Sequence, residues 1–498
     1  MKKNISIFTT IFMICVLLMV NISSVSALPG SNWATGIKLQ NLSSTTDGVI
    51  SIKLFDVGGN LASTISTTST GTPLTVKKSS SVEVYLPSYS SIPNNQYSAE
   101  ISANVPIGVV ATMTNYDYGI ADSYNSMVPS TEVSVPYVYH NHNYWATEIF
   151  IQNTTSESLT GQIFLIEPVG GTSSGDGLGN KTIDYSIPAF GTYSINTASS
   201  TFDSMNWFIG SARITSSKAI AVVANQVRIV GAGNVKGNVL IQSRGLSGAD
   251  IGNQIVIPSL YKNFSGASGT WISGIKLVNP STTDTVTADV VFTSDPDNTA
   301  FTGTKTVTIP ANSNAELYLP NVTLNGGGQI PNMFKGSAKI NVVGSGNVVA
   351  TVQHTNYSGA SGYGVALGYT GFTVGHSQVS LPSLYRWPSG AGIWISGIKV
   401  QNMGQDPVVI KIDLKTDPDV STWTGSKSNV TLQPGAAYEL YLGANGNLDG
   451  GTSIPQPWKG SALITATGTG EIIIVGTVLH TNYGRNVANM YTGIGIQP

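Results

Sequence analysis

A ten-residue segment recurs four times in this chain and constrains its fold more than any other feature. It reads NWATGIKLQN from Asn32, YWATEIFIQN from Tyr144, TWISGIKLVN from Thr270 and IWISGIKVQN from Ile393. A second segment (YSAEI, GSARI, GSAKI or GSALI) follows each copy, and its serine lies 65, 66, 66 and 67 residues after the tryptophan of that copy. Two landmarks that keep the same spacing predict four homologous repeats.

Each copy of the first segment alternates with a period of two residues. Trp271, Ile275 and Leu277 fall on one side of an extended chain, whereas Lys276 falls on the other. This alternation indicates a strand with one face on a core and its polar face directed outward. We interpret the four tryptophans as core anchors of the repeats: Trp33, Trp145, Trp271 and Trp394.

The rest of each repeat also has the character of β-structure. Apolar runs of strand length alternate with turns rich in Gly, Pro, Asn and Asp, and no long window has a helical period. We therefore predict an all-β chain of four tandem β-sandwich, immunoglobulin-like domains, in which a tryptophan lies on one strand but the usual cysteine pair is missing. The expected domains are residues 28–131, 132–252, 253–376 and 377–498, which we call repeats 1 to 4.

Residues 1–27 have the features of a cleaved signal peptide. Lys2 and Lys3 precede a mostly apolar run, and Val25-Ser26-Ala27 offers a small-residue cleavage site. The apolar run is short for a membrane span, so we expect no span in the mature chain. The single cysteine, Cys15, lies in the removed segment, which leaves no thiol for disulfides or cysteine chemistry.

Charge is unusually scarce. Charged residues make up 10% of the chain, against about 25% in typical soluble proteins, and the formal net charge is −2. The chain contains no basic block, and this argues against nucleic acid as a partner. The surface is expected to consist of uncharged polar residues, which suits an extracellular location.

A short connector precedes three of the repeats. It reads VSVPYVYH, IVIPSLYK and VSLPSLYR before repeats 2, 3 and 4, and repeat 1 has no such segment. If the connector completes a sheet, repeat 1 has an open edge that could accept a strand from another chain, giving head-to-tail self-assembly. The alternative is that LPGSN or a local rearrangement covers the edge.

The search for metal sites gives weak candidates. Two Asp-Pro-Asp segments could contribute carboxylates to a calcium loop, although the same residues also make ordinary β-turns, which is the interpretation we favour. The four carboxylates are Asp295, Asp297, Asp417 and Asp419. His140 and His142 would share a strand face, but two ligands do not make a site. We expect no cofactor, with calcium as the minor alternative.

Catalytic motifs are not evident, so we expect that the chain is not an enzyme. A secreted hydrolase stays as an alternative, because paired carboxylates of a glycosidase come together only in the fold. Carbohydrate binding is the stronger alternative, since it uses exposed aromatic platforms. The weak platform candidates are Trp207, Trp387, Tyr116 and Tyr118, for which packing between domains is the competing interpretation.

The combined pattern W-x-[ST]-G-I-x-[LV]-x-N, GSA-x-I and TNY resembles exported prokaryotic cell-surface proteins of the S-layer-like and adhesin-like kind, built from tandem immunoglobulin-like repeats. The resemblance implies a secreted or surface-associated structural or adhesive protein, a rod or bent chain that acts as a spacer with repeated binding surfaces. It also implies partners among cell-surface or extracellular polysaccharides and proteins, or self-assembly. No functional residue is carried over from it.

Overall fold

The computed structural model describes residues 14–18, 28–168, 181–199, 202, 207–233, 237–266, 269–356, 364–386, 393–417, 422–443, 448–469, 472–482 and 487–496. The chain is nearly all-β and is built of antiparallel sheets, which confirms the predicted fold class at this level. The helical elements of the described residues are three-residue 3₁₀ turns, and none of them is long and apolar enough to cross a membrane.

Repeats 1 and 2 each consist of a series of strands. Those of repeat 1 are β2 (Ala34–Asn41), β3 (Gly48–Phe55), β4 (Leu61–Ile65), β5 (Thr75–Val76), β6 (Ser81–Tyr85), β7 (Tyr97–Ala103), β8 (Ile107–Asn115) and β9 (Ile120–Asn125), with turn η1 (Leu86–Ser88) and the earlier strand β1 (Ile14–Leu18). Those of repeat 2 are β10 (Ser130–His140), β11 (Trp145–Asn153), β12 (Leu159–Ile166), β13 (Thr182–Ile187), β14 (Thr192–Asn196), β15 (Phe208–Arg228) and β16 (Val239–Arg244), with turn η3 (Gly248–Asp250).

Repeats 3 and 4 are built in the same way. The elements of repeat 3 are β17 (Gln254–Lys262), β18 (Phe264–Gly266), β19 (Gly269–Asn279), β20 (Val286–Ser294), β21 (Thr302–Ile309), β22 (Ser313–Tyr318), η4 (Leu319–Asn321), β23 (Phe334–Val343), β24 (Val349–Asn356) and β25 (Val365–Thr370). Those of repeat 4 are β26 (Gln378–Arg386), β27 (Trp394–Asn402), β28 (Val408–Thr416), β29 (Thr424–Leu432), β30 (Ala437–Tyr441), η6 (Asp449–Gly451), β31 (Trp458–Gly468), β32 (Ile474–Asn482), β33 (Val487–Thr492) and β34 (Ile494–Ile496).

Each repeat consists of two sheets, and the order of strands in these sheets is the same in all repeats. It is clearest in repeat 3. One sheet has the order β17-β23-β20-β21, and the other pairs β22, β19, β24 and β25 in that order. In repeat 2 the two sheets share the long strand β15, and in repeat 4 they form one continuous nine-stranded sheet. The conserved spacing of the two sequence landmarks therefore corresponds to a conserved pairing scheme.

The asparagine that ends each opening strand pins the turn that follows. The Asn279 side chain donates to the carbonyls of Asp284 (2.7 Å) and Ile309 (3.0 Å), and its oxygen accepts from the Ser281 N–H. Asn41, Asn153 and Asn402 make corresponding bonds in the other repeats. These bonds satisfy backbone groups at the strand end, which explains why the sequence repeats an asparagine there.

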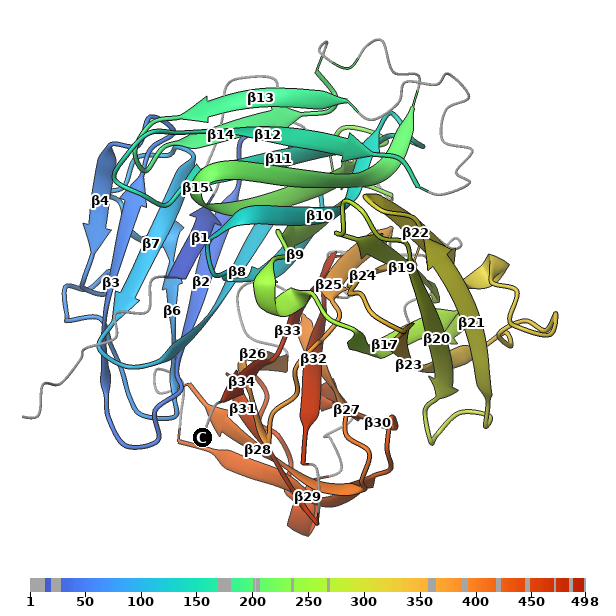
Figure 1. Ribbon diagram of the computed structural model, residues 1–498. Coiled ribbons are helices and arrows are strands. Elements are labelled where there is room, and N and C mark those ends of the chain that lie inside the picture. Colours follow the sequence, from blue (N-terminus) through green and yellow to red (C-terminus); the bar gives the residue numbers. More distant parts are fainter. Residues whose placement is uncertain are drawn as a thin grey trace, which may run out of the picture.

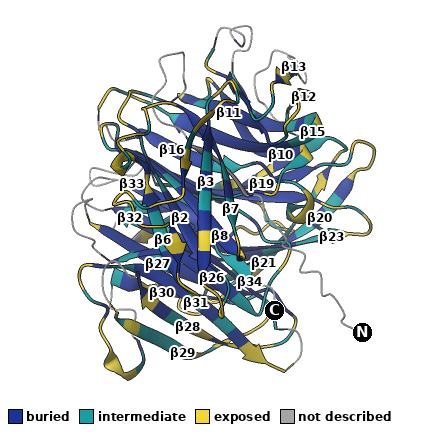
Figure 2. Cartoon of the chain, turned by 90° about the vertical axis from the view of Figure 1, so that its left-hand side faces the viewer, coloured by how far each residue is buried: buried dark blue, intermediate teal, exposed yellow. Residues whose placement is uncertain are grey.

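The opening strands are buried on both faces, which differs from the sequence expectation. Lys38, Lys276 and Lys399, expected to point outward, are only 3%, 0% and 4% exposed. By contrast, β28 alternates between buried and exposed positions as a half-buried strand should (Figure 2). The polar face of the opening strand is covered because a neighbouring repeat packs on it.

The four repeats close around a common centre and do not extend as the expected rod. One strand from each repeat takes part in a cycle of contacts, β9 on β16, β16 on β25, β25 on β33 and β33 on β9, near the middle of Figure 1. A cavity of about 20 Å³ at this centre is lined by three consecutive residues from each of the four strands. Because repeat 4 contacts repeat 1, the arrangement is a closed ring, and repeat boundaries are buried interfaces.

Apolar packing continues across the boundaries of the ring. The core of repeat 1 includes Phe150 and Val223 of repeat 2, and the core of repeat 4 includes Val110 of repeat 1. Repeat 3 similarly packs against Ala488 and Met490 of repeat 4. Neighbouring cores thus merge, so each repeat depends on its neighbours for part of its buried apolar surface.

Candidate functional site

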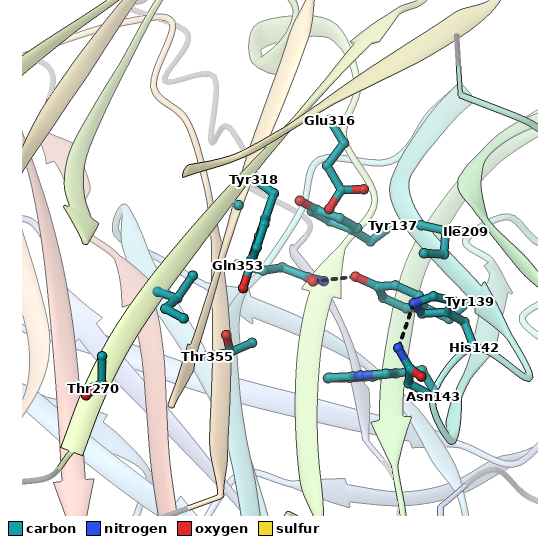
Figure 3. A pocket seen from close by; sticks show the side chains of 13 residues that line it. Tyr137, Tyr139, His142, Asn143, Ile209, Thr270, Glu316, Tyr318, Gln353 and Thr355 are labelled. Carbon is teal, nitrogen blue, oxygen red and sulfur yellow. Dashed lines mark hydrogen bonds between the residues drawn. The ribbon is translucent and has the colours of Figure 1, made fainter. Parts of the chain in front are cut away.

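A pocket of about 560 Å³ lies between repeats 2 and 3, and Figure 3 shows the side chains that line it. Repeat 2 contributes an aromatic wall, and repeat 3 contributes polar groups opposite that wall. The lining includes Tyr137, Tyr139, Trp145, Gly274, Glu316 and Gln353. A cleft at a domain boundary with an aromatic wall and a few convergent polar groups is the usual form of a small-ligand site.

The aromatic wall follows from the period of β10. Tyr137 and Tyr139 are two residues apart, so both point to the same side of the strand, and Trp145 begins the next strand beside them. The rings of Tyr137 and Tyr139 stack with centroids 5.8 Å apart, and the Tyr139 and Trp145 centroids are 5.2 Å apart. Their faces form one continuous apolar surface.

The polar groups come from the strands of repeat 3. The Tyr139 hydroxyl donates to Oε1 of Gln353 at 2.6 Å, which joins the two repeats across the pocket (Figure 3). Nζ of Lys276 lies 3.1 Å from Glu316 Oε2 and 5.1 Å from the centroid of the Tyr137 ring. Glu316 is therefore a carboxylate of the pocket whose negative charge is balanced by Lys276 of the same repeat.

The Tyr137 hydroxyl is the most informative group in the pocket. The side chain is 2% exposed, and the hydroxyl has no hydrogen-bond partner among the described residues. Gly274 leaves it room, because a Cβ at that position would lie 3.3 Å from the hydroxyl oxygen. Burial, with Glu316 second, raises the pKa of Tyr137 well above 10, so the group stays a protonated donor. A buried donor without an acceptor is costly, and a ligand oxygen would satisfy it.

The equivalent pocket between repeats 3 and 4 differs at the two decisive positions. It encloses about 380 Å³ and keeps the aromatic residues Tyr261 and Trp271. Ser259 stands in place of Tyr137, and Lys335 stands in place of Ile209. The Lys335 ammonium lies 3.2 Å from Glu439 Oε2 and 2.6 Å from Asp297 Oδ2. Repeat 2 thus has Ile209 where repeat 3 has a lysine, and Tyr137 where repeat 3 has a serine. The pocket between repeats 2 and 3 is therefore the more suitable one for an uncharged ligand.

A further pocket of about 600 Å³ lies in repeat 1 and is also lined by aromatic residues, among them Trp33, Tyr85 and Tyr116. At its rim the Asn32 side chain donates to Oδ2 of Asp117 at 2.5 Å. Among the predicted platform candidates, Tyr116 lines this pocket, whereas Tyr118 packs against the core of repeat 1.

The remaining predicted aromatic residues fall in different places. The four repeat tryptophans are buried, with exposed fractions of 5 to 7%, and three of them line pockets. Trp207 is half-buried, and its ring lies 5.1 Å from that of His142 at the edge of the pocket between repeats 2 and 3. Trp387 lies outside the described residues.

The predicted calcium candidates are engaged by lysines. Asp295 pairs with Lys399 of repeat 4 at 2.5 Å, and Asp417 pairs with Lys38 of repeat 1. Asp297 pairs with Lys335, and Asp419 lies outside the described residues. Within the described residues, no group of three or more His, Cys, Asp or Glu side chains is placed to hold a metal ion. Asp295 and Asp417 thus join neighbouring repeats, whereas Asp297 pairs within its own repeat.

The two repeat-equivalent histidines are buried hydrogen-bonding groups. The Nδ1 atoms of His354 and His480 lie 2.8 Å and 2.7 Å from the hydroxyls of Ser273 and Ser396. Burial lowers the pKa of each histidine to about 3, so both are neutral at physiological pH. They form part of the packing behind the aromatic residues.

Sequence reasoning did not single out Tyr137, Tyr139, Glu316 or Gln353. A signal was present, because the connector before repeat 2 reads Pro-Tyr-Val-Tyr where the others read Pro-Ser-Leu-Tyr. This exchange distinguishes repeat 2 from the others, but only the ring brings Tyr137 close to Gly274 and Glu316 of repeat 3.

Comparison with known proteins does not assign the chain to a family. No family model and no curated protein matches it. Among solved structures, "Crystal Structure of Thermotoga maritima 1070" is 17% identical and covers 24% of this chain and 95% of its own, with a TM-score of 0.19.

Two other solved structures cover more of the chain. The viral chemokine binding protein R17 of rodent gammaherpesvirus Peru is 9% identical, covers 75% of this chain and 88% of its own, and has a TM-score of 0.15. The BSP domain of a biofilm associated protein is 10% identical and covers 98% and 96%, also with a TM-score of 0.15. At such TM-scores neither the fold nor the function of this chain follows from these proteins.

Proposed function

We propose that this is an exported protein of four immunoglobulin-like β-sandwich domains that binds an extracellular polysaccharide at the cell surface. A saccharide unit occupies the pocket between repeats 2 and 3. The observation that carries the proposal is the aromatic wall of Tyr137, Tyr139 and Trp145 with an unpartnered tyrosine hydroxyl in it.

The chemistry of a sugar matches this lining. One face of a pyranose carries C–H groups, which pack on aromatic faces, and its edge carries hydroxyls that both donate and accept. The Tyr137 hydroxyl supplies a donor, and the Glu316 carboxylate supplies an acceptor. A purely apolar ligand would pair with neither of these groups and would leave the Tyr137 hydroxyl without a partner.

The same lining supports binding over hydrolysis. Glycosidases use two carboxyl groups separated by about 5 to 9.5 Å. The described lining of this pocket contains one carboxylate, Glu316, and its charge is already paired with Lys276. Export is supported by the predicted signal peptide, by the low content of charge and by the single cysteine within the removed segment.

Replacing Tyr137 with Phe separates binding from stability. Because the hydroxyl has no partner among the described residues, we expect Y137F to keep the free energy of unfolding or to raise it slightly. Loss of this buried donor should weaken saccharide binding about ten-fold. Glycan-array screening identifies the ligand, and calorimetry on the full chain measures its dissociation constant.

Tyr441→Phe is the matched control, since Tyr441 lines the pocket between repeats 3 and 4. It should leave the measured affinity unchanged. Absence of saccharide binding by the unmodified protein would refute the proposal, and so would equal affinity of Y137F and the wild type.

A further inference from the structure

The connector strands complete one sheet in each repeat. β10, β17 and β26 pair with β15, β23 and β31, each with an irregularity of register at its proline. In repeat 1 the corresponding place beside β7 is taken by β1, which runs antiparallel from Ile14 opposite Ile101 to Leu18 opposite Tyr97. The strand missing from the sequence repeat is therefore supplied by the N-terminal segment.

This segment lies within the predicted signal peptide. Cleavage after Ala27 would remove residues 14–18 and leave one edge of β7 without its pairing strand. The edge is not on an open surface, because β1 also contacts β15 of repeat 2. The core cluster of repeat 1 joins Ala99 and Ile101 of β7 with Val223 and Val227 of β15. The mature chain would thus carry a strand-sized slot with unpaired backbone groups and apolar walls, which is costly unless it is filled.

We propose that this slot in the mature protein accepts an extended apolar peptide of a partner protein, which pairs antiparallel with β7 between repeats 1 and 2. The proposal rests on the export part of the proposed function. The strands found at the four equivalent places indicate the chemistry of the occupant, since β1 is wholly apolar and the other three combine apolar residues with a proline and a few polar ones. A second copy is disfavoured because every described strand already pairs within its own chain.

The pairing register of β1 with β7 allows peptide binding in the slot to be detected through a disulfide bond. Cys15 stands opposite Glu100, so a Glu100→Cys variant of residues 28–498 carries the chain's only thiol at the slot. The replaced carboxylate makes only a loose pair with Lys53 at 3.5 Å, so little stability is lost. The probe is a peptide of residues 13–19 with flanking lysines for solubility, whose natural Cys15 is activated as a mixed disulfide with 2-thiopyridine, so that attack by the introduced thiolate forms the new disulfide and releases thiopyridone.

Pairing in the slot should make disulfide formation about ten-fold faster than at Thr64→Cys, which lies on β4 at the opposite edge of the same sheet. A scrambled peptide should lose this preference. Equal rates at the two positions would overturn the proposal. Dimers of the variant that form without peptide would overturn the choice of a foreign strand in favour of a second copy.

Hydrogen exchange on the unsubstituted 28–498 protein gives a second measurement that needs no variant. The amides of Tyr97–Ala103 that face the slot and do not bond to β3 should exchange fast and become protected when the probe peptide is added. Full protection without peptide would show that the chain covers its own edge and would refute the proposal. N-terminal sequencing of the exported protein tests the cleavage itself, and saccharide affinity at the other pocket reports on the proposed function separately.

Discussion

Replacing Lys399 with Ala should lower the free energy of unfolding by about 3 to 5 kcal/mol, because it leaves a buried carboxylate without its counter-ion. Nζ of Lys399 lies 2.5 Å from Asp295 Oδ2, and the two side chains are 5% and 3% exposed. Oδ1 of Asp295 has no hydrogen-bond partner in the described structure, so the lysine provides most of the compensation. Chemical denaturation of the full chain measures the loss.

The stability lost in the Lys399→Ala variant should also depend on pH. Burial already raises the pKa of Asp295 above its usual value in the presence of Lys399. Removing the lysine raises it further, so the folded variant takes up a proton more readily than the unfolded chain does. Its deficit relative to the wild type should therefore shrink as the pH falls toward the acid range.

The matched control is Lys411→Ala in the same repeat, where the lysine pairs with Asp413 and both side chains are about half exposed. An exposed pair of this kind contributes about 0 to 1 kcal/mol. If K399A proves as stable as K411A, the interface between repeats 3 and 4 does not form in solution as described.

Replacing Asp122 with Ala should cost about 3 kcal/mol, since this carboxylate links three repeats at the centre of the ring. The side chain is fully buried, and it accepts from the backbone N–H groups of Gln242 in repeat 2 (2.7 Å) and Met490 in repeat 4 (3.1 Å). Truncation leaves two buried donors without acceptors, at about 1 to 3 kcal/mol each. Burial raises the pKa of Asp122 well above its ordinary value, so part of this loss is offset by the cost of burying the group.

Asn489 occupies the equivalent position in repeat 4 and provides the control. Its side-chain oxygen is buried without a partner, so Asn489→Ala should cost about 1 kcal/mol or less. Thermal or chemical unfolding of both variants checks the difference. Equal losses would indicate that Asp122 does not connect the repeats.

The sequence was informative about strands and much less so about what covers them. The alternation in TWISGIKLVN correctly indicates strand β19 with Trp271 and Ile275 in the core. The same pattern cannot reveal that Lys276 on the other face is fully buried. A period of two separates the faces of a strand, but a buried lysine needs a partner such as a carboxylate, an aromatic ring or a carbonyl, and that partner depends on tertiary packing.

The candidate site shows the same limit. The four tryptophans are buried, but only Trp33 and Trp271 belong to the main core of their repeat, whereas Trp145 and Trp394 lie in small clusters between repeats. Three of the four line pockets. Tyr137 was not recognisable, because its role depends on Gly274 and Glu316 of the next repeat. Neither residue stands out until the ring closes. Tandem repeats are equally consistent with a rod and with a ring, because the contacts that distinguish these arrangements are made between repeats.

Small-angle X-ray scattering on residues 28–498 tests the closed ring most directly. A compact chain of this length should have a radius of gyration of about 23 Å, the value typical of a single globular body. Four sandwiches of the same size placed end to end would give about 40 Å or more. A value near 23 Å with a single-peaked distance distribution is the predicted result. A value near 40 Å would contradict the ring, and with it the pocket between repeats 2 and 3.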